Sequence, residues 1–113
     1  MDETILTSFA LQNGLVLKKD VFHGASGVEF RKPEKDGIVC LGYFIAGSEV
    51  EIYIRRLGKY HELINDKLWM LGGVFRLFGY KPDTQYRCID RLKMSEFTHA
   101  KFIKVVQVEL IAS

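Results

Sequence analysis

The sequence has few of the residues and motifs that mark catalysis or metal binding. It contains two cysteines, Cys40 and Cys88, and neither belongs to a CxxC pair or has a histidine at zinc-ligand spacing. It has no GxxxxGK(S/T) loop, no GxGxxG and no GxSxG. We therefore expect no enzyme, no cofactor and no metal site. We expect both cysteines to be buried free thiols, with a disulfide between them as the alternative.

The sequence also lacks long hydrophobic runs and a large excess of charge of one sign. No apolar run approaches the roughly 20 residues that a membrane helix needs. The first residues, Met1 to Thr4, are acidic and give no secretion signal, so we expect synthesis in a cytoplasm and no membrane partner. The net charge of +2 does not by itself indicate nucleic-acid binding. Its 113 residues predict one domain, 1–113.

The middle of the chain has the clearest secondary-structure pattern. Residues 49–56 alternate polar and apolar side chains, which predicts a half-buried strand with Val50, Ile52 and Ile54 on one face. Residues 59–71 repeat apolar side chains every three or four positions, which predicts a helix. The pattern then predicts a strand over 74–80, a turn over 81–84 and a strand over 85–92.

Toward the N-terminus the pattern is weaker. Asn13-Gly14 between two apolar runs predicts a β-hairpin, although the first run can instead form a short helix capped by Thr4. The glycine-rich and charged segment 18–39 predicts a long loop or an extended, weakly packed hairpin. Residues 38–45 are strongly apolar and predict a strand, followed by a turn at 46–48.

The C-terminal segment 103–111 is rich in β-branched residues and predicts a last strand. These elements are mostly strands joined by short connections, which favours antiparallel pairing. The predicted fold class is α+β and mainly β. We expect a small antiparallel β-sandwich or half-open barrel with one flanking α-helix at about 59–71.

Basic and aromatic side chains in the predicted strands suggest one alternative function. On a sheet, such side chains can grip and stack single-stranded nucleic acid, so a small nucleic-acid-binding module is the second hypothesis. The residues concerned are Arg55, Arg56, Arg76, Arg87, Arg91, Lys93, Tyr53, Phe75, Phe78, Tyr80 and Tyr86. The simpler interpretation is that the aromatics form the core and the basic residues form a solvated face.

The order of the predicted elements resembles a family of phage proteins. Pro33-Glu34-Lys35-Asp36-Gly37 resembles the loop that precedes a long strand, a helix and further strands in the distal tail proteins of long-tailed phages. The resemblance runs from about Glu29 to the C-terminus and ends on the predicted strand at 105–111. The chain has Glu34-Lys35 where the family has Gly-Arg. A domain of this size also resembles lambda-like minor tail proteins and tail completion proteins.

The resemblance implies a tail-tube-like domain without catalytic activity. Such subunits assemble as a ring, commonly a hexamer, beside other tail proteins and around a channel through which DNA passes without specific binding. The virion tail is the implied location, after synthesis in the host bacterial cytoplasm. We expect the charged segment to contact an adjacent subunit or ring. Its residues are Arg31, Lys32, Glu34, Lys35 and Asp36.

Overall fold

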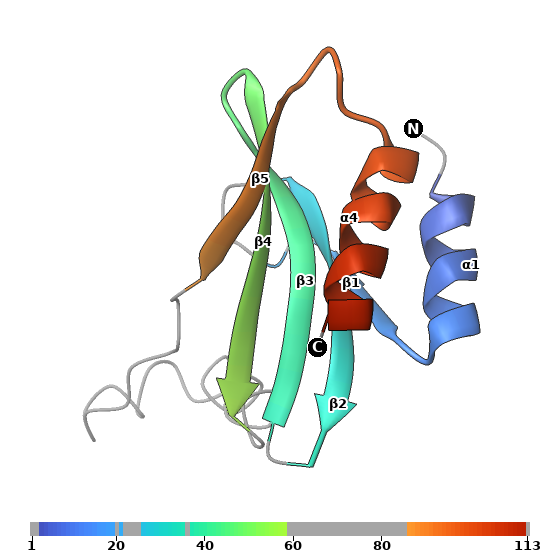
Figure 1. Cartoon of the computed structure of the whole chain (residues 1–113). Helices are drawn as coiled ribbons and strands as arrows, with labels where there is room; N and C mark the ends of the chain where they lie inside the picture. The colour runs from blue at the N-terminus through green and yellow to red at the C-terminus, as the bar shows by residue number, and fades with distance from the viewer. Residues whose placement is uncertain (1–2, 20, 22–25, 36, 59–85, 113) are drawn as a thin grey trace, which may run out of the picture.

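The computed structural model describes residues 3–19, 21, 26–35, 37–58 and 86–112. The predicted helix at 59–71, strand at 74–80 and turn at 81–84 lie outside these residues. The described part of the chain forms one five-stranded antiparallel sheet and two helices (Figure 1). The predicted fold class, α+β and mainly β with a flanking helix, is confirmed. Within the described residues the sheet is open, because its two outermost strands do not pair with each other.

The strands lie across the sheet in chain order, so each strand pairs with its neighbour in sequence. A left-handed glycine, Gly47 (φ 65°), forms the tight turn between the third and fourth strands, where the sequence predicts a turn. The predicted strands at 38–45, 49–56 and 85–92 are confirmed, and each predicted end lies within two residues of the observed one. The strands are β1 (Val16–Lys19), β2 (Gly27–Glu34), β3 (Gly37–Ala46), β4 (Glu49–Gly58) and β5 (Arg87–Lys93).

The segment predicted as a long loop or weakly packed hairpin contains a well-packed strand. Within 18–39, β2 pairs with β3 residue by residue from Gly27 opposite Phe44 to Glu34 opposite Gly37. The hairpin part of the prediction was right, and the weak packing was wrong. Val28 and Phe30 are buried, as is the glutamate between them. The alternation of apolar and charged residues here reflects a strand with two buried faces, not a loop.

The N-terminal hairpin prediction was wrong, and its helical alternative is confirmed. Helix α1 (Thr4–Asn13) buries Leu6 and Phe9 against the sheet. Asn13-Gly14 ends this helix instead of turning a hairpin: Gly14 is left-handed (φ 64°), and the amide of Leu15 donates to the carbonyl of Ala10 at 2.9 Å. The predicted Thr4 cap is not present, because the helix N-cap is Glu3 and makes no side-chain capping bond.

The predicted C-terminal strand was also wrong. Residues 103–111 belong to helix α4 (His99–Ala112). Its start is capped by Thr98, whose hydroxyl oxygen accepts from the amide of Lys101 at 3.1 Å. The buried residues Phe102 and Val106 are four positions apart, which is the spacing of one helix face. The segment predicted as a strand begins at Ile103, so it left out both Phe102 and the capping residue Thr98, which mark the helix.

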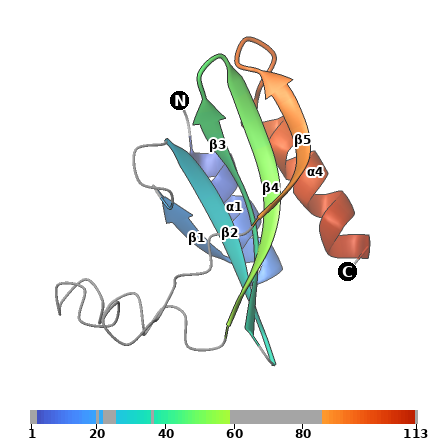
Figure 2. The ribbon, with the colours of Figure 1, turned by 90° about the vertical axis from the view of Figure 1, so that its left-hand side faces the viewer.

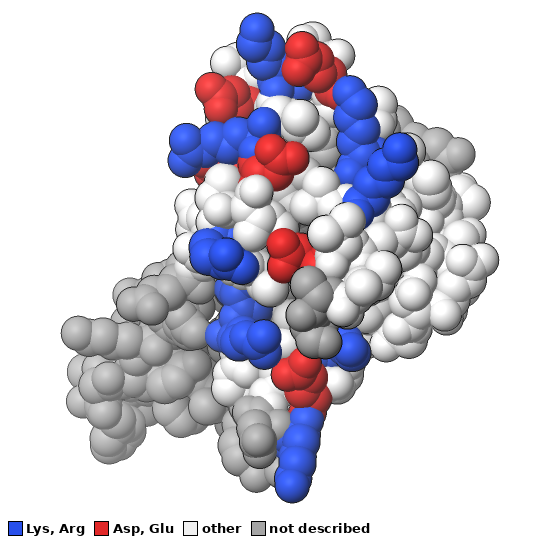
Figure 3. Space-filling view, viewed as in Figure 1, with Lys and Arg blue, Asp and Glu red and all other residues white. Residues whose placement is uncertain are grey.

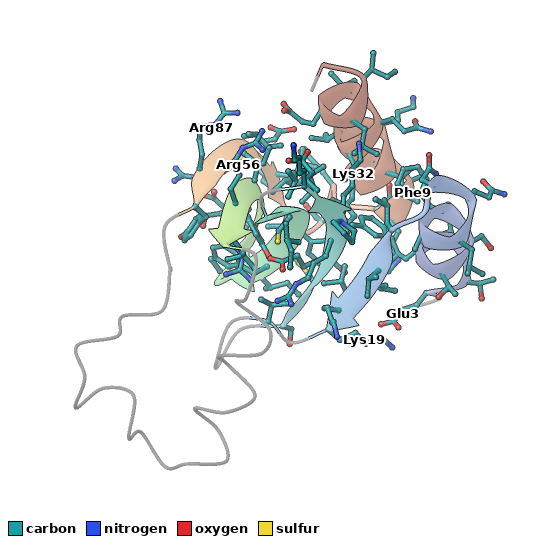
Figure 4. The ribbon with its side chains drawn as sticks, turned by 90° about the horizontal axis from the view of Figure 1, so that it is seen from below. Glu3, Phe9, Lys19, Lys32, Arg56 and Arg87 are labelled. Atoms are coloured by element: carbon teal, nitrogen blue, oxygen red, sulfur yellow. The ribbon has the colours of Figure 1, made fainter. Side chains whose placement is uncertain are left out.

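The two helices lie side by side on one face of the sheet and form the core with it (Figures 1 and 2). Phe30 of β2 is at the centre, stacked on Phe102 of α4 at 5.5 Å between ring centroids and edge-on to Phe9 of α1 at 5.3 Å. An ion pair between Glu3 and Lys19 links the start of α1 to β1, as Figure 4 shows. No helix within the described ranges is long and apolar enough to cross a membrane.

Candidate functional site

The sheet face opposite the helices has an unusual set of buried charges. Cross-strand pairing puts Glu29, Gly42 and Tyr53 in one row, and Arg31, Cys40 and Arg55 in the next. Since paired residues share a face, these side chains all point away from the helices. Glu29, Tyr53 and Arg55 are each buried. We call Glu29, Arg31, Tyr53 and Arg55 the Glu29 cluster.

Both carboxylate oxygens of Glu29 accept hydrogen bonds from the cluster. Arg55 donates from Nε to Oε2 at 2.8 Å and from Nη2 to Oε1 at 3.0 Å, which is the bidentate geometry that suits guanidinium and carboxylate groups. Arg31 donates from Nε to Oε1 at 2.8 Å, and the Tyr53 hydroxyl donates to Oε2 at 2.6 Å. Among the described residues, no buried side-chain nitrogen or oxygen lacks a hydrogen-bond partner.

The interactions within the cluster keep Glu29 ionised and Tyr53 and Cys40 protonated at neutral pH. Burial alone raises the pKa of Glu29, but the hydrogen bonds from Arg55 and Tyr53 outweigh it and hold the pKa below its ordinary value of 4.5. Burial, followed by the Glu29 charge, raises the pKa of Tyr53, so its hydroxyl remains a donor. Burial and Glu29 also raise the pKa of Cys40 to about 12. The Cys40 thiol therefore stays protonated at neutral pH and is a poor nucleophile.

Gly42 allows Tyr53 to reach Glu29. A Cβ atom on Gly42 would lie 2.5 Å from the Tyr53 hydroxyl oxygen and 2.6 Å from the carbonyl oxygen of Val28. The tyrosine ring thus lies across β3 at the one residue of that row that has no side chain. The sequence pattern does not reveal this requirement, because a glycine in a strand is equally consistent with a bulge.

We expect Gly42→Ala to lower the free energy of unfolding by about 1–3 kcal/mol, because the methyl group displaces the Tyr53 ring and crowds a backbone carbonyl. Urea titration followed by circular dichroism measures the change. Gly58→Ala is the matched control, since a Cβ there has no atom within 4 Å outside its neighbours. Equal midpoints for the two variants would contradict the role assigned to Gly42.

The structure separates the predicted interface residues into two groups. Arg31 is directed to Glu29, and its side chain is 11% exposed. Lys32, Glu34 and Lys35 are exposed at the end of the β2–β3 hairpin, while Asp36 lies outside the described residues. Glu34 there accepts a hydrogen bond of 3.4 Å from Nη1 of Arg56. We call residues 32–35 the hairpin tip; Figure 4 labels Lys32 and Arg56 at this end of the sheet.

A second polar contact lies under the helices. The Tyr43 hydroxyl and His99 Nε2 are 2.9 Å apart, and both residues are buried. The Tyr43 ring packs on Phe97 at 4.6 Å and edge-on to Phe102 at 4.8 Å. This pair joins the start of α4 to β3, and it lies inside the apolar core.

The described ranges contain no group of three or more His, Cys, Asp or Glu side chains that could hold a metal ion. The two cysteines are free, with Cys40 buried as predicted and Cys88 half-buried. Cys40 faces away from the helices and His99 begins one of them, so they do not form a nucleophile pair. His23 and His61 lie outside the described residues.

Sequence reasoning missed the Glu29 cluster because it interpreted residues 18–39 as a long loop or weakly packed hairpin and assigned their charges to a contact with another subunit. One signal was available: Glu29 and Arg31 alternate with Val28 and Phe30, which is the pattern of a strand. The partners Tyr53 and Arg55 come from β4, and only the register shows that they meet Glu29. Comparison with known proteins found no matching family model, no matching curated protein and no matching solved structure.

Proposed function

We propose that this protein is a non-catalytic structural subunit that assembles with copies of itself and with other proteins. In its specific form, the proposal is a phage tail component that forms a ring around the DNA channel. The polar groups on the outer sheet face support a structural role, since the Glu29 cluster satisfies its own hydrogen bonds and has a thiol beside it whose pKa is raised.

The hairpin tip is the observation that carries the proposal. β1 pairs with β2 only as far as Arg31, and in Figure 1 the ends of β2 and β3 extend beyond both helices. Lys32, Glu34 and Lys35 are exposed on this extension. β2 and β3 remain paired as far as Glu34 and Gly37, so the tip is a charged arm held by strand pairing. Such an arm suits side-chain contacts with a neighbouring subunit.

The specific ring proposal rests on the part of the resemblance that agrees with the structure. Residues 49–56, which supply the long strand of the resemblance, lie in β4 and follow the Pro33–Gly37 segment after β3. The terminal segment is helix α4 where the resemblance implies a strand, so it adds no support. The proposal therefore depends on the hairpin, its charged tip and the strand that follows.

Two of the residues proposed to bind nucleic acid belong to the Glu29 cluster. Tyr53 and Arg55 are buried and bonded to Glu29, so they are not placed to stack or grip a strand of nucleic acid. Tyr86 packs edge-on to Phe44 and Tyr53, each at 5.6 Å. Four residues proposed for this function, Arg76, Phe75, Phe78 and Tyr80, lie outside the described residues.

Charge reversal of the hairpin tip tests the proposal. We expect the full chain, alone or co-expressed with the neighbouring proteins of its source, to form particles of several times 13.0 kDa that are rings in electron micrographs. Lys32→Glu with Lys35→Glu weakens this assembly at least tenfold while the circular dichroism spectrum is unchanged. The predicted interface residues also include Asp36, so Lys35→Glu with Asp36→Lys gives a second variant of the same test.

Lys93→Glu, at the end of β5, is the control and leaves assembly unchanged. Light scattering after gel filtration measures the mass. Rings that form equally well with the reversed tip would remove the role of the hairpin. A 13.0 kDa species that binds single-stranded DNA with an affinity falling steeply with salt would favour the nucleic-acid module instead.

A further inference from the structure

Three basic residues share one face of the sheet at its lower end in Figure 1. Lys32 of β2 and Arg56 of β4 both pair with Val39 of β3, so they lie in one row across the sheet. Arg87 of β5 pairs with Ile54, two residues before Arg56, and therefore shares this face. All three basic residues are exposed, and we call Lys32, Arg56 and Arg87 the basic row.

The basic row lies on the face that the helices cover higher up the sheet. Ile54 packs against the core there, and Lys32 comes two residues after the core residue Phe30. Figure 4, which looks at this end of the sheet from below, shows Arg87 and Arg56 next to each other and Lys32 further toward α1. In Figure 3 the lower half of the molecule shows more blue than red side chains over the sheet, whereas the upper end carries both. The sheet surface beyond the helices is therefore predominantly basic.

The positive charge of the row is only partly balanced within the described ranges. Lys32 and Arg87 form no ion pair with another described residue. Arg56 meets Glu34 at 3.4 Å, but the two side chains are 65% and 40% exposed, and a pair of this kind is weak. Glu109, in the last turn of α4, is half-buried. An excess of positive charge thus remains at this end of the sheet.

The spacing of the row suits carboxylates carried by a peptide. Strands lie about 4.8 Å apart and residues rise about 3.3 Å along a strand, so the three backbone positions span roughly 15 Å. Alternate residues of an extended peptide repeat every 6.6 Å or so on one side, and residues four apart on a helix about every 6 Å. Two or three Asp or Glu side chains of either kind of segment can therefore meet the row. The guanidinium groups of Arg56 and Arg87 can bind such carboxylates bidentately.

We propose that the basic row binds an acidic segment of a neighbouring protein subunit. The inference deepens the proposed function and rests on it, because it names the partner of the surface that begins at the hairpin tip. Glu34 illustrates the chemistry, since its carboxylate accepts a hydrogen bond from Arg56 and a bound Asp or Glu side chain would make the same kind of contact. Exposed charges of this type act mainly on the rate of association and on the choice of partner.

Nucleic acid fits this surface less well. Within the described residues, the side chains between the basic ones are the aliphatic Val39 and Ile54, and the next pair toward the end of the sheet is Gly37 and Gly58. No aromatic ring is therefore placed there to stack a base. Glu34 also puts an exposed carboxylate where a phosphate backbone would approach. A protein segment can meet this carboxylate with a basic residue of its own, which a nucleic acid does not have.

A peptide titration tests the proposal. The probe is dye-labelled octaglutamate, whose fluorescence anisotropy is measured against the full chain at about 20 mM and about 150 mM salt. We expect a dissociation constant of about 0.1–1 mM at the lower salt, because exposed ion pairs are individually weak, and about threefold weaker binding at the higher salt. Lys32→Gln with Arg87→Gln weakens binding about threefold or more. The matched control is Lys101→Gln with Lys104→Gln, which removes two exposed positive charges from α4 and leaves binding unchanged.

Three results would overturn the proposal. Equal weakening by the two variants would mean that octaglutamate responds to net charge and not to the row. Absence of binding at the lower salt would remove the contact. Tighter binding of an eight-residue oligothymidylate, lost in Lys32→Gln with Arg87→Gln, would assign the row to nucleic acid. Circular dichroism checks that both variants fold.

The titration is separate from the assembly measurements on the hairpin tip. Rings that form although the row binds no octaglutamate would leave the proposed function standing without this partner. A chain that binds octaglutamate through Lys32 and Arg87 but forms no ring would keep the acidic contact and remove the ring.

Discussion

Glu29→Gln is expected to lower the free energy of unfolding by about 3–5 kcal/mol, which is a large fraction of the roughly 5–15 kcal/mol that stabilises an ordinary domain. Glutamine keeps the shape of the side chain but removes the charge that faces Arg31 and Arg55. Those guanidinium groups have left water, and without the carboxylate they carry uncompensated charge. Urea titration of the two proteins at pH 7 measures the difference. Glu34→Gln, which removes a partly exposed ion pair with Arg56, changes stability by less than about 1 kcal/mol.

The pH dependence of the same two proteins gives an independent readout. The pKa of Glu29 is lower in the folded chain than its ordinary value of 4.5, because the Arg55 and Tyr53 hydrogen bonds outweigh burial. Its contribution is therefore complete above pH 4.5 and is lost as the pH falls through the folded-state pKa. The stability of the native chain then drops more steeply below pH 4.5 than that of Glu29→Gln. Parallel curves would mean that Glu29 is not held ionised by its neighbours.

Strands with regular alternation could be predicted from the sequence, and their partners could not. In β4, Val50 and Ile52 face the core as the pattern indicates. The same pattern makes the other face polar and predicts that it is solvated. Tyr53 and Arg55 are instead buried there, because β2 supplies the carboxylate that neutralises Arg55. Burial of a charge depends on a partner distant in sequence, and local patterns do not contain that information.

Helix α1 was predicted only as an alternative and helix α4 was missed, because single residues favour more than one structure. Asn-Gly accommodates positive φ, which suits a hairpin turn and a helix C-terminus alike. At the end of α1, Gly14 uses its positive φ to terminate the helix. β-Branched residues favour strands on average, but packing overrides this preference when apolar side chains recur at helical spacing. In α4, Phe102 and Val106 supply that spacing, and Thr98 marks the start.

The second large effect is expected at Phe102. Phe102→Ala removes a fully buried ring that stacks on Phe30 and contacts Tyr43 edge-on, so α4 loses its main anchor on the sheet. We expect the free energy of unfolding to fall by about 3–5 kcal/mol, from lost apolar burial and the cavity left behind. Thermal and urea unfolding of the full chain measure it. A loss below about 1 kcal/mol would contradict this packing of α4.

A pair of valines in the same helix shows whether the loss comes from helical packing. Val106 is buried and Val108 is 65% exposed. A strand over 103–111 would put both on one face, and truncating either would then have a similar effect. In the helix they point in directions about 160° apart, being two residues away from each other at 100° per residue. We therefore expect Val106→Ala to destabilise the chain by about 1–3 kcal/mol and Val108→Ala to change it by less than about 0.5 kcal/mol. Equal losses at the two positions would contradict the helical packing of this segment and favour the strand.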